Sequence, residues 1–293
     1  MARKRDRPGD VPPRSDEEIQ PQDLVVTFLG AYAYRDQRAV WSGGLVELLG
    51  RFGFSTGSAR VALTRLVARG LLERVRDGRF VSYVLTDRSR RVVEEGERRL
   101  AAFGRTAPGD GRWTLVWYSI PDPLHVERHR FSRRLRFLGF GPLEDGVWVA
   151  PRDQADAVLA ILADLDVERH ASVFVTTVRD RDAHPAFVAR AWDLDGLAAR
   201  YGDFLARFGG CRAAALDDAE AFEVRTRLVN TFRRFPYLDP GLPEGLAPPI
   251  AGREEAHALF HELYAALAEP AQRYFDLRTG RIGAGGDVAA AAR

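Results

Sequence analysis

A helix-forming segment that runs directly into a β-hairpin signal is the feature that most restricts the fold of this chain. A helix that begins near Thr56 places its apolar and smallest residues on one side: Ala59, Ala62, Leu63, Leu66 and Gly70. The runs 71–76 and 79–86 are rich in β-forming residues, and they meet at Asp77-Gly78, which is a strong type I′ turn signal. The segment therefore predicts a helix packed on other helices, followed by a two-stranded wing.

Two earlier segments, 24–33 and 42–52, have the apolar spacing of helices. Ser42 stands where it would cap the second of them, and Ser55 or Thr56 where it would cap the third. Gly70 is placed to end the third helix. Three helices and a wing in this order predict a winged helix-turn-helix.

Positive charge is concentrated in the same region. Residues 51–105 contain 13 arginines and 6 acidic residues, a net charge of +7, although the whole chain is only +2. Residues 183–293 contain 13 arginines and 15 acidic residues, a net charge of −2. A local positive field of this kind is typical of a module that binds a polyanion.

The outward face of the third helix is small, polar and cationic, which suits a helix that lies in a groove of duplex DNA. We expect four residues to face the bases: Ser58, Val61, Thr64 and Arg65. Four arginines are expected to hold the phosphate backbone: Arg60, Arg69, Arg76 and Arg79. The alternative is that these arginines form only a solvated surface.

Periodicity changes after the Gly/Pro-containing stretch 106–111. Predicted strands and helices then alternate as βαββαβ, the ferredoxin-like order, and the chain is helical from about residue 183. The predicted class is α+β with a winged helix-turn-helix, a ferredoxin-like middle domain and a helical C-terminal domain. The expected ranges are 1–21 for a disordered arm, 22–105, 112–182 and 183–280 for the three domains, and 281–293 for a disordered tail.

The composition excludes several classes of protein. No apolar run approaches the roughly 18 residues of a membrane span, and residues 1–18 lack the apolar stretch of a signal peptide. The single cysteine, Cys211, excludes an internal disulfide and a cysteine-based zinc site within one chain. We therefore expect a cytoplasmic protein without a metal or another cofactor.

Four segments in order resemble the PaaX family of bacterial transcriptional repressors. They are SARVALTRLVARGLLERVRDGR with the following SYVLT, then RWTLVWYSIPD, LGFGPLEDGVWVAP, and RTRLVNTFRRFPYLDPGLPEGLAPP. The resemblance covers residues 22–277. It implies a GntR-like winged helix, a homodimer on a palindromic operator, and release of that operator by a small effector.

In founding members of the family the effector is phenylacetyl-coenzyme A, an acyl-CoA, and the regulated genes degrade aromatic acids. We expect an effector site at Asn230, Arg233, Arg234 and Tyr237. The two arginines would meet coenzyme A phosphates or, equally, form structural ion pairs. Family members often have His at the position of Asn230 and Trp near Ile250, so the identity of the ligand stays open.

A metal-dependent nuclease is the alternative function. The YSIPD stretch resembles the first strand of small ferredoxin-like CRISPR endonucleases, in which an Asp that follows the Tyr binds metal. Ser119 stands there in this chain, and we expect the nearby Asp122 to cap a helix. Two-metal chemistry needs clustered carboxylates, and the sequence indicates no catalytic residues. An architectural DNA-binding protein without an effector is a third possibility.

Two further sets of residues admit a binding role or a packing role. Trp113, Trp117 and Trp148 would stack on an aromatic effector or lie in the core, and we expect the core. His257 and His261 have a spacing that suits a metal on one helix face. Because no third ligand is evident, we expect these histidines to have surface or packing roles.

Overall fold

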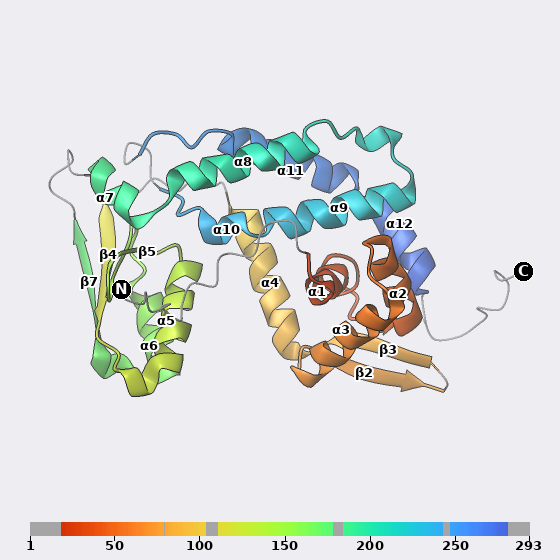
Figure 1. The fold of residues 1–293 in the computed structure, drawn as a ribbon, viewed down its shortest axis with the longest axis horizontal. Coiled ribbons are helices and arrows are strands. Elements are labelled where there is room, and N and C mark those ends of the chain that lie inside the picture. Colours follow the sequence, from red (N-terminus) through yellow and green to blue (C-terminus); the bar gives the residue numbers. More distant parts are fainter. Residues whose placement is uncertain (1–18, 79, 104–110, 178–183, 243–246, 281–293) are drawn as a thin grey trace, which may run out of the picture. The chain divides into compact units, whose positions relative to one another are not determined.

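The computed structural model describes residues 19–78, 80–103, 111–177, 184–242 and 247–280 (Figure 1). The fold mixes helices with two antiparallel sheets, as expected for the α+β class. The chain forms two compact units that alternate along the sequence. Unit 1 comprises Met1–Val93, Ala215–Thr231 and Leu267–Arg293, and unit 2 comprises Glu94–Ala214 and Phe232–Ala266.

Unit 1 contains the predicted helices and hairpin. Helices α1 (Pro21–Tyr32), α2 (Ser42–Arg51) and α3 (Thr56–Ala68) precede strands β2 (Leu72–Asp77) and β3 (Phe80–Leu85). Strand β1 (Val40–Trp41) joins them in a three-stranded sheet of order β1-β3-β2. Gly70 has a φ of +64° just after α3, which is the left-handed conformation that glycine favours at a helix end.

Two details differ from the sequence prediction. The residue that precedes α2 is Trp41, and no side chain caps that helix, so Ser42 is its first residue rather than its cap. Asp77 pairs with Phe80 as the last residue of β2, so the turn begins one residue later than predicted. Gly78, with a φ of +53°, supplies the left-handed residue that the turn requires.

Helices from the C-terminal part of the chain complete the core of unit 1. They are α9 (Asp218–Phe232) and α12 (Ala268–Thr279). Phe222 lies 5.3 Å from the rings of both Phe28 and Tyr32, and Tyr32 stacks on Phe275 at 5.0 Å. The hydroxyl groups of Tyr32 and Thr226 are hydrogen-bonded at 3.2 Å. Aromatic pairs of this kind stabilise by about 0.5–1.5 kcal/mol beyond their buried area.

The helical C-terminal part of the chain is interrupted between two of its helices. Helix α11 (Arg253–Ala266) ends before Leu267, and α12 begins at Ala268. Pro270 lies in the first turn of α12. A proline has no N–H to donate, and its ring clashes with the carbonyl four residues earlier, so an uninterrupted helix is disfavoured there.

Unit 2 is built on a four-stranded antiparallel sheet of order β5-β6-β4-β7. Its strands are β4 (Arg112–Tyr118), β5 (Gly141–Glu144), β6 (Val147–Ala150) and β7 (Ala171–Thr177). Helices α5 (His125–Phe137) and α6 (Ala155–Leu165) follow β4 and β6, which gives the predicted βαββαβ order. Both helices contribute to one core cluster with one face of the sheet through residues such as Val116, Phe131 and Leu162.

Helix α7 (His184–Ala191) packs on the opposite face of this sheet, where Trp113, Val149 and Val188 form a second cluster. Unit 2 also contains α8 (Leu194–Phe208), α10 (Phe235–Leu238) and α11. Helix α4 (Asp87–Ala102) begins in unit 1 and continues into unit 2. Within the described residues, no helix combines the length and the apolar character needed to cross a bilayer.

The contact of α2 with α12 predicts opposite effects for two glycines of one helix. A Cβ at Gly44 would lie 2.3 Å from the carbonyl oxygen of Arg278. Gly44→Ala must push the two helices apart and should cost about 1–3 kcal/mol. At Gly50 a Cβ meets nothing within 4 Å, so Gly50→Ala should stabilise by about 0.5–1 kcal/mol. Thermal denaturation measures both, and equal melting temperatures would contradict the close packing.

Candidate nucleic-acid interface

Helix α3 is held in place by a capped first turn and a buried apolar side. The backbone N–H of Ser58 donates to Oγ of Ser55 at 3.2 Å, so Ser55 rather than Thr56 is the cap. Such a cap stabilises a helix by about 1 kcal/mol. Four residues of the helix are buried: Ala59, Ala62, Leu63 and Leu66. Anchoring on one side fixes which residues face solvent.

The opposite side of α3 is open to solvent. It is formed by Ser58, Arg60, Val61, Thr64 and Arg65, all of which are exposed, with Arg69 at the end of the helix. Val61, at 49% exposure, contributes an apolar side chain to this surface. The Thr64 hydroxyl donates to the carbonyl oxygen of Arg60 at 3.0 Å. Because the side chains between the arginines are small, the helix backbone can approach the groove of a duplex closely.

Strand β2 continues the cationic surface. Arg74 and Arg76 are exposed beside the buried Leu72. Arg79, which was predicted to hold the backbone of DNA, lies outside the described residues. In the part of the chain that the structure describes, none of five arginines has an acidic partner: Arg60, Arg65, Arg69, Arg74 and Arg76.

Several other arginines of unit 1 are paired with acidic residues. Arg273 forms an ion pair with Asp218 at 2.6 Å, Arg278 with Glu47 at 2.7 Å, and Arg38 pairs with Asp276. Arginine that is not neutralised within its own chain keeps all of its N–H donors for phosphate oxygens or guanine edges. The α3–β2 surface can therefore bind a polyanion.

The four predicted effector residues lie in the segment from α9 to α10, in different environments. Asn230 is 3% exposed, and its side-chain oxygen has no hydrogen-bond partner among the described residues. Arg233 and Arg234 are half-buried and have interaction partners. Tyr237 is 41% exposed, and its ring lies 4.9 Å from that of Phe137. Asn230 belongs to unit 1 and the other three to unit 2.

A buried carboxylate that sequence reasoning missed organises the same part of unit 2. The Asp239 side chain is fully buried and accepts hydrogen bonds from the Tyr201 hydroxyl at 2.7 Å and the Gly241 N–H at 2.8 Å. Arg253 lies 2.8 Å from the same carboxylate. Burial and this carboxylate raise the pKa of Tyr201 well above its usual range. The Asp-Pro-Gly sequence at 239–241 was the available signal, because such a turn often uses the aspartate as an acceptor.

The predicted packing role of His257 agrees with its surroundings. Its ring lies 4.4 Å from that of Phe103 and 5.4 Å from that of Phe232, and its Nε2 is buried without a hydrogen bond. Burial, and secondarily Arg253, lower the pKa of His257 to about 4. No three His, Cys, Asp or Glu side chains gather as a metal site within the described ranges.

The tryptophans divide between core and surface. Trp113 and Trp148 are buried as expected, in the clusters on opposite faces of the sheet. The expectation is wrong for Trp117, which is 57% exposed. Helix α7 packs on the Trp113 end of that face, and Trp117 lies four residues further along β4.

Asp122 does not have the expected capping role. It begins a short 3₁₀ turn without capping it through its side chain, and its carboxylate accepts from Arg128 at 3.0 Å. The side chain is 92% exposed. Among the described residues, this carboxylate has no second carboxylate beside it. It is paired with an arginine and is solvated, so it is a poor ligand for a catalytic metal. The arrangement does not support a nuclease.

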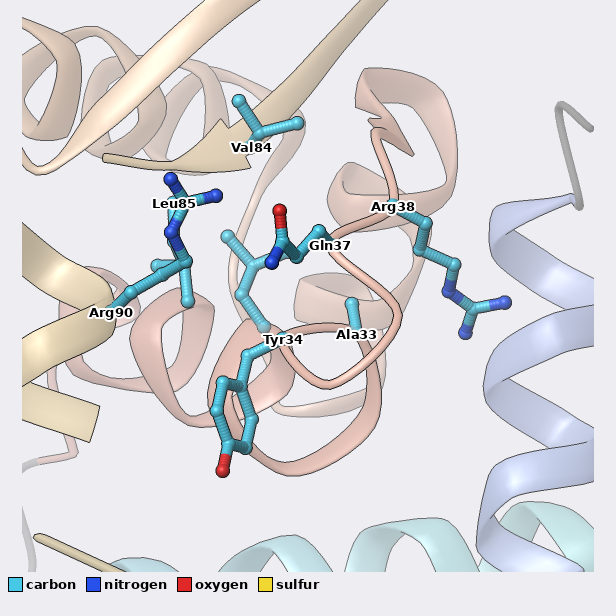
Figure 2. A pocket seen from close by; sticks show the side chains of 8 residues that line it. Ala33, Tyr34, Gln37, Arg38, Val84, Leu85 and Arg90 are labelled. Carbon is cyan, nitrogen blue, oxygen red and sulfur yellow. The ribbon is translucent and has the colours of Figure 1, made fainter. Parts of the chain in front are cut away.

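A small hollow in unit 1 lies between α1, β3 and α4 (Figure 2). Its free volume is about 10 Å³, room for roughly one water molecule, whereas drug-sized ligands occupy pockets of about 300–1,000 Å³. Figure 2 shows the Arg38 guanidinium pointing away from it toward α12. The hollow is therefore too small for an acyl-coenzyme A.

Three segments of the chain match models of one protein family. A model described as "PaaX-like protein" matches residues 20–89, the "PaaX protein central Cas2-like domain" matches 106–188, and the "PaaX-like protein C-terminal domain" matches 192–277. The chain belongs to the PaaX family. The resemblance inferred from the four sequence segments is thereby confirmed.

Two relatives support this assignment. The transcriptional repressor PaaX of Escherichia coli K12 is 28% identical over 276 residues, which cover 91% of this chain and 86% of the relative. The structure of the uncharacterized protein Rv0674 from Mycobacterium tuberculosis matches with a TM-score of 0.56 at 22% identity, over 88% of this chain and 98% of that one. The second likeness concerns the fold alone. The PaaX family consists of regulators, so this chain is not an enzyme.

The environment of His257 predicts a pH effect on stability. The pKa of His257 is lowered in the folded chain. Between about pH 6.5 and 4, this histidine is therefore protonated in the unfolded chain but neutral in the folded chain. The contribution of His257 to stability should be constant above about pH 6.5 and fall as the pH drops toward 4. His257→Phe should flatten this part of the profile, as measured by thermal unfolding between pH 4 and 8. The same substitution at the exposed His261 is the control, and an unchanged slope in His257→Phe would contradict the assignment.

Proposed function

We propose that the protein is a transcriptional repressor that binds operator DNA through the α3–β2 surface. The observation that carries this proposal is the row of exposed arginines without acidic partners on α3 and β2. Membership of the PaaX family and the likeness to the E. coli transcriptional repressor support it. A cytoplasmic location and double-stranded DNA as the partner belong to the same proposal.

The arrangement of both units supports the finer fold assignment. In unit 1, α3 is followed by the antiparallel β2–β3 pair, the order of a winged helix-turn-helix. In unit 2, the strand order β5-β6-β4-β7 and the helices α5 and α6 on one face fit a ferredoxin-like domain. We propose these two folds; the domain ranges given from the sequence stay a prediction.

The proposed roles on DNA follow from side-chain chemistry. Ser58, Val61, Thr64 and Arg65 would face base edges, because they line the open side of α3. Arg60, Arg69 and Arg76 at the borders of this surface would hold phosphates. Arg79 keeps the same proposed role from the sequence alone. A homodimer would place two such surfaces on half-sites about one helical turn apart.

Release of DNA is proposed to follow the binding of a small effector, such as an aryl-acyl-coenzyme A. The guanidinium groups of Arg233 and Arg234 suit its phosphates, and Tyr237 suits an aromatic group or the adenine ring. The buried side-chain oxygen of Asn230 has no hydrogen-bond partner among the described residues, so it could accept a hydrogen bond from the effector. The effector would act by favouring a conformation with lower affinity for the operator.

The base-reading role predicts a specific loss of affinity. Arg65→Ala should weaken binding to the upstream operator duplex by about 1–3 kcal/mol and reduce discrimination against an unrelated duplex, because a guanine contact is lost. Fluorescence anisotropy at fixed salt measures both. Arg88→Ala is the matched control, since Arg88 is exposed and belongs to α4 of the same unit, not to α3 or β2. Unchanged operator affinity in Arg65→Ala would refute the proposed contact.

The effector proposal predicts selective release by a thioester. Phenylacetyl-coenzyme A should lower operator affinity in a gel-shift titration, whereas free coenzyme A and phenylacetate should not. Arg233→Ala should raise the half-effective concentration about 10- to 100-fold, the loss expected for a charge-assisted hydrogen bond of about 1.5–3 kcal/mol. Arg212→Ala in the same unit is the control. Operator affinity that no acyl thioester changes would favour an architectural protein.

A further inference from the structure

Helix α5 of unit 2 carries a second cationic surface, separate from α3 and β2. Its sequence, HVERHRFSRRLRF, contains five arginines and one glutamate, which gives a net charge of +4. Helix α6 packs on the same sheet face and contains two aspartates and no basic residue. Surfaces that serve only solubility usually mix both signs along an element, and apart from Glu127 α5 carries only positive charge, which suits an anionic partner.

The arginines of α5 fall into two groups. Arg128 pairs with Asp122 at 3.0 Å and Arg134 with Asp164 at 2.5 Å, so these two serve the fold. The other three, Arg130, Arg133 and Arg136, are exposed, and within the described residues none has an acidic partner. Arg136 lies over the Trp148 ring at 5.2 Å, which leaves its N–H donors available.

Helical geometry sets the unpaired arginines along one side. Phe131 and Leu135 are buried and fix the inner face of α5. At 100° per residue, Arg133 lies opposite this face, and Arg130 and Arg136 lie about 60° to either side of Arg133. The exposed His125 and His129 lie alongside. We name this surface, formed by His125, His129, Arg130, Arg133 and Arg136, the α5 stripe.

Charge at the helix terminus does not explain the α5 stripe. Basic residues in a last turn are favoured by the helix dipole, and Arg134 and Arg136 lie in that turn. Arg130 and Arg133 precede it, so the dipole gives them little stabilisation. Their side chains also lie along a convex helix surface instead of converging on one point, as donors to a compact phosphate would. A row of cations matches an extended polyanion.

We propose that the α5 stripe is a second contact with the phosphate backbone of duplex DNA, made by unit 2. This inference rests on the proposed function, because it adds a sequence-independent contact to the specific one made by α3 and β2. From Arg130 to Arg136 the helix rises by about 9 Å, and phosphates of one strand recur every ~3.4 Å along the duplex axis. The α5 stripe can therefore engage two or three phosphates.

The test is the salt dependence of duplex binding by the full chain. Arg130→Ala combined with Arg133→Ala should reduce the slope of log affinity against log salt by about 2, because each neutralised phosphate contributes about 0.9. At about 150 mM salt, affinity should fall roughly tenfold for the upstream duplex and an unrelated duplex alike. Replacing both arginines with lysine should restore the slope, since an ammonium group also neutralises a phosphate.

A matched control is Arg207→Ala combined with Arg212→Ala, which removes two exposed arginines of unit 2 outside α5 and should leave the slope unchanged. If the α5 variant keeps the slope while Arg65→Ala loses affinity, the α5 contact is refuted and the repressor function stands. If the wild-type chain binds no duplex, both proposals fail. If the α5 variant loses binding only to phosphatidylserine vesicles, the surface meets a membrane and the DNA proposal is wrong.

Discussion

The aromatic cluster around Phe222 is the interaction on which unit 1 depends. Phe222 contacts Phe28 and Tyr32 of α1 and lies 5.5 Å from Tyr274 of α12. The cluster closes a core that α1, α2 and α3 share with helices from the other end of the chain. Because α3 is anchored on this core, the orientation of its exposed arginines follows from aromatic packing among segments far apart in sequence.

Much of the local structure could be predicted because it depends on short-range chemistry. The cap at Ser55, the left-handed Gly70 and the turn at Gly78 are set by neighbouring residues, and the structure contains all three. The exposure of Arg60 and Arg65 also followed from helical periodicity. Their roles on DNA stay predictions, because exposure alone does not show what a surface binds.

Long-range features could not be predicted in this way. Nothing near Phe222 indicates that its partners are Phe28 and Tyr32, since apolar spacing shows which side of a helix is buried but not which element covers it. Trp117 shows the same limit, because strand alternation cannot reveal how far α7 extends across the sheet. The buried role of Asp239 likewise depends on Tyr201 and Arg253, which lie in other helices.

The interleaving of unit 1 along the sequence has a consequence for biosynthesis. The Tyr32–Thr226 hydrogen bond joins residues 194 positions apart, and α12 ends only at Thr279. A nascent chain that has emerged as far as unit 2 still lacks α12, so the core beneath α3 is incomplete. Closing so long a loop is slow compared with local folding. The proposed operator binding therefore requires a chain that includes α12, and products terminated before α12 would lack it.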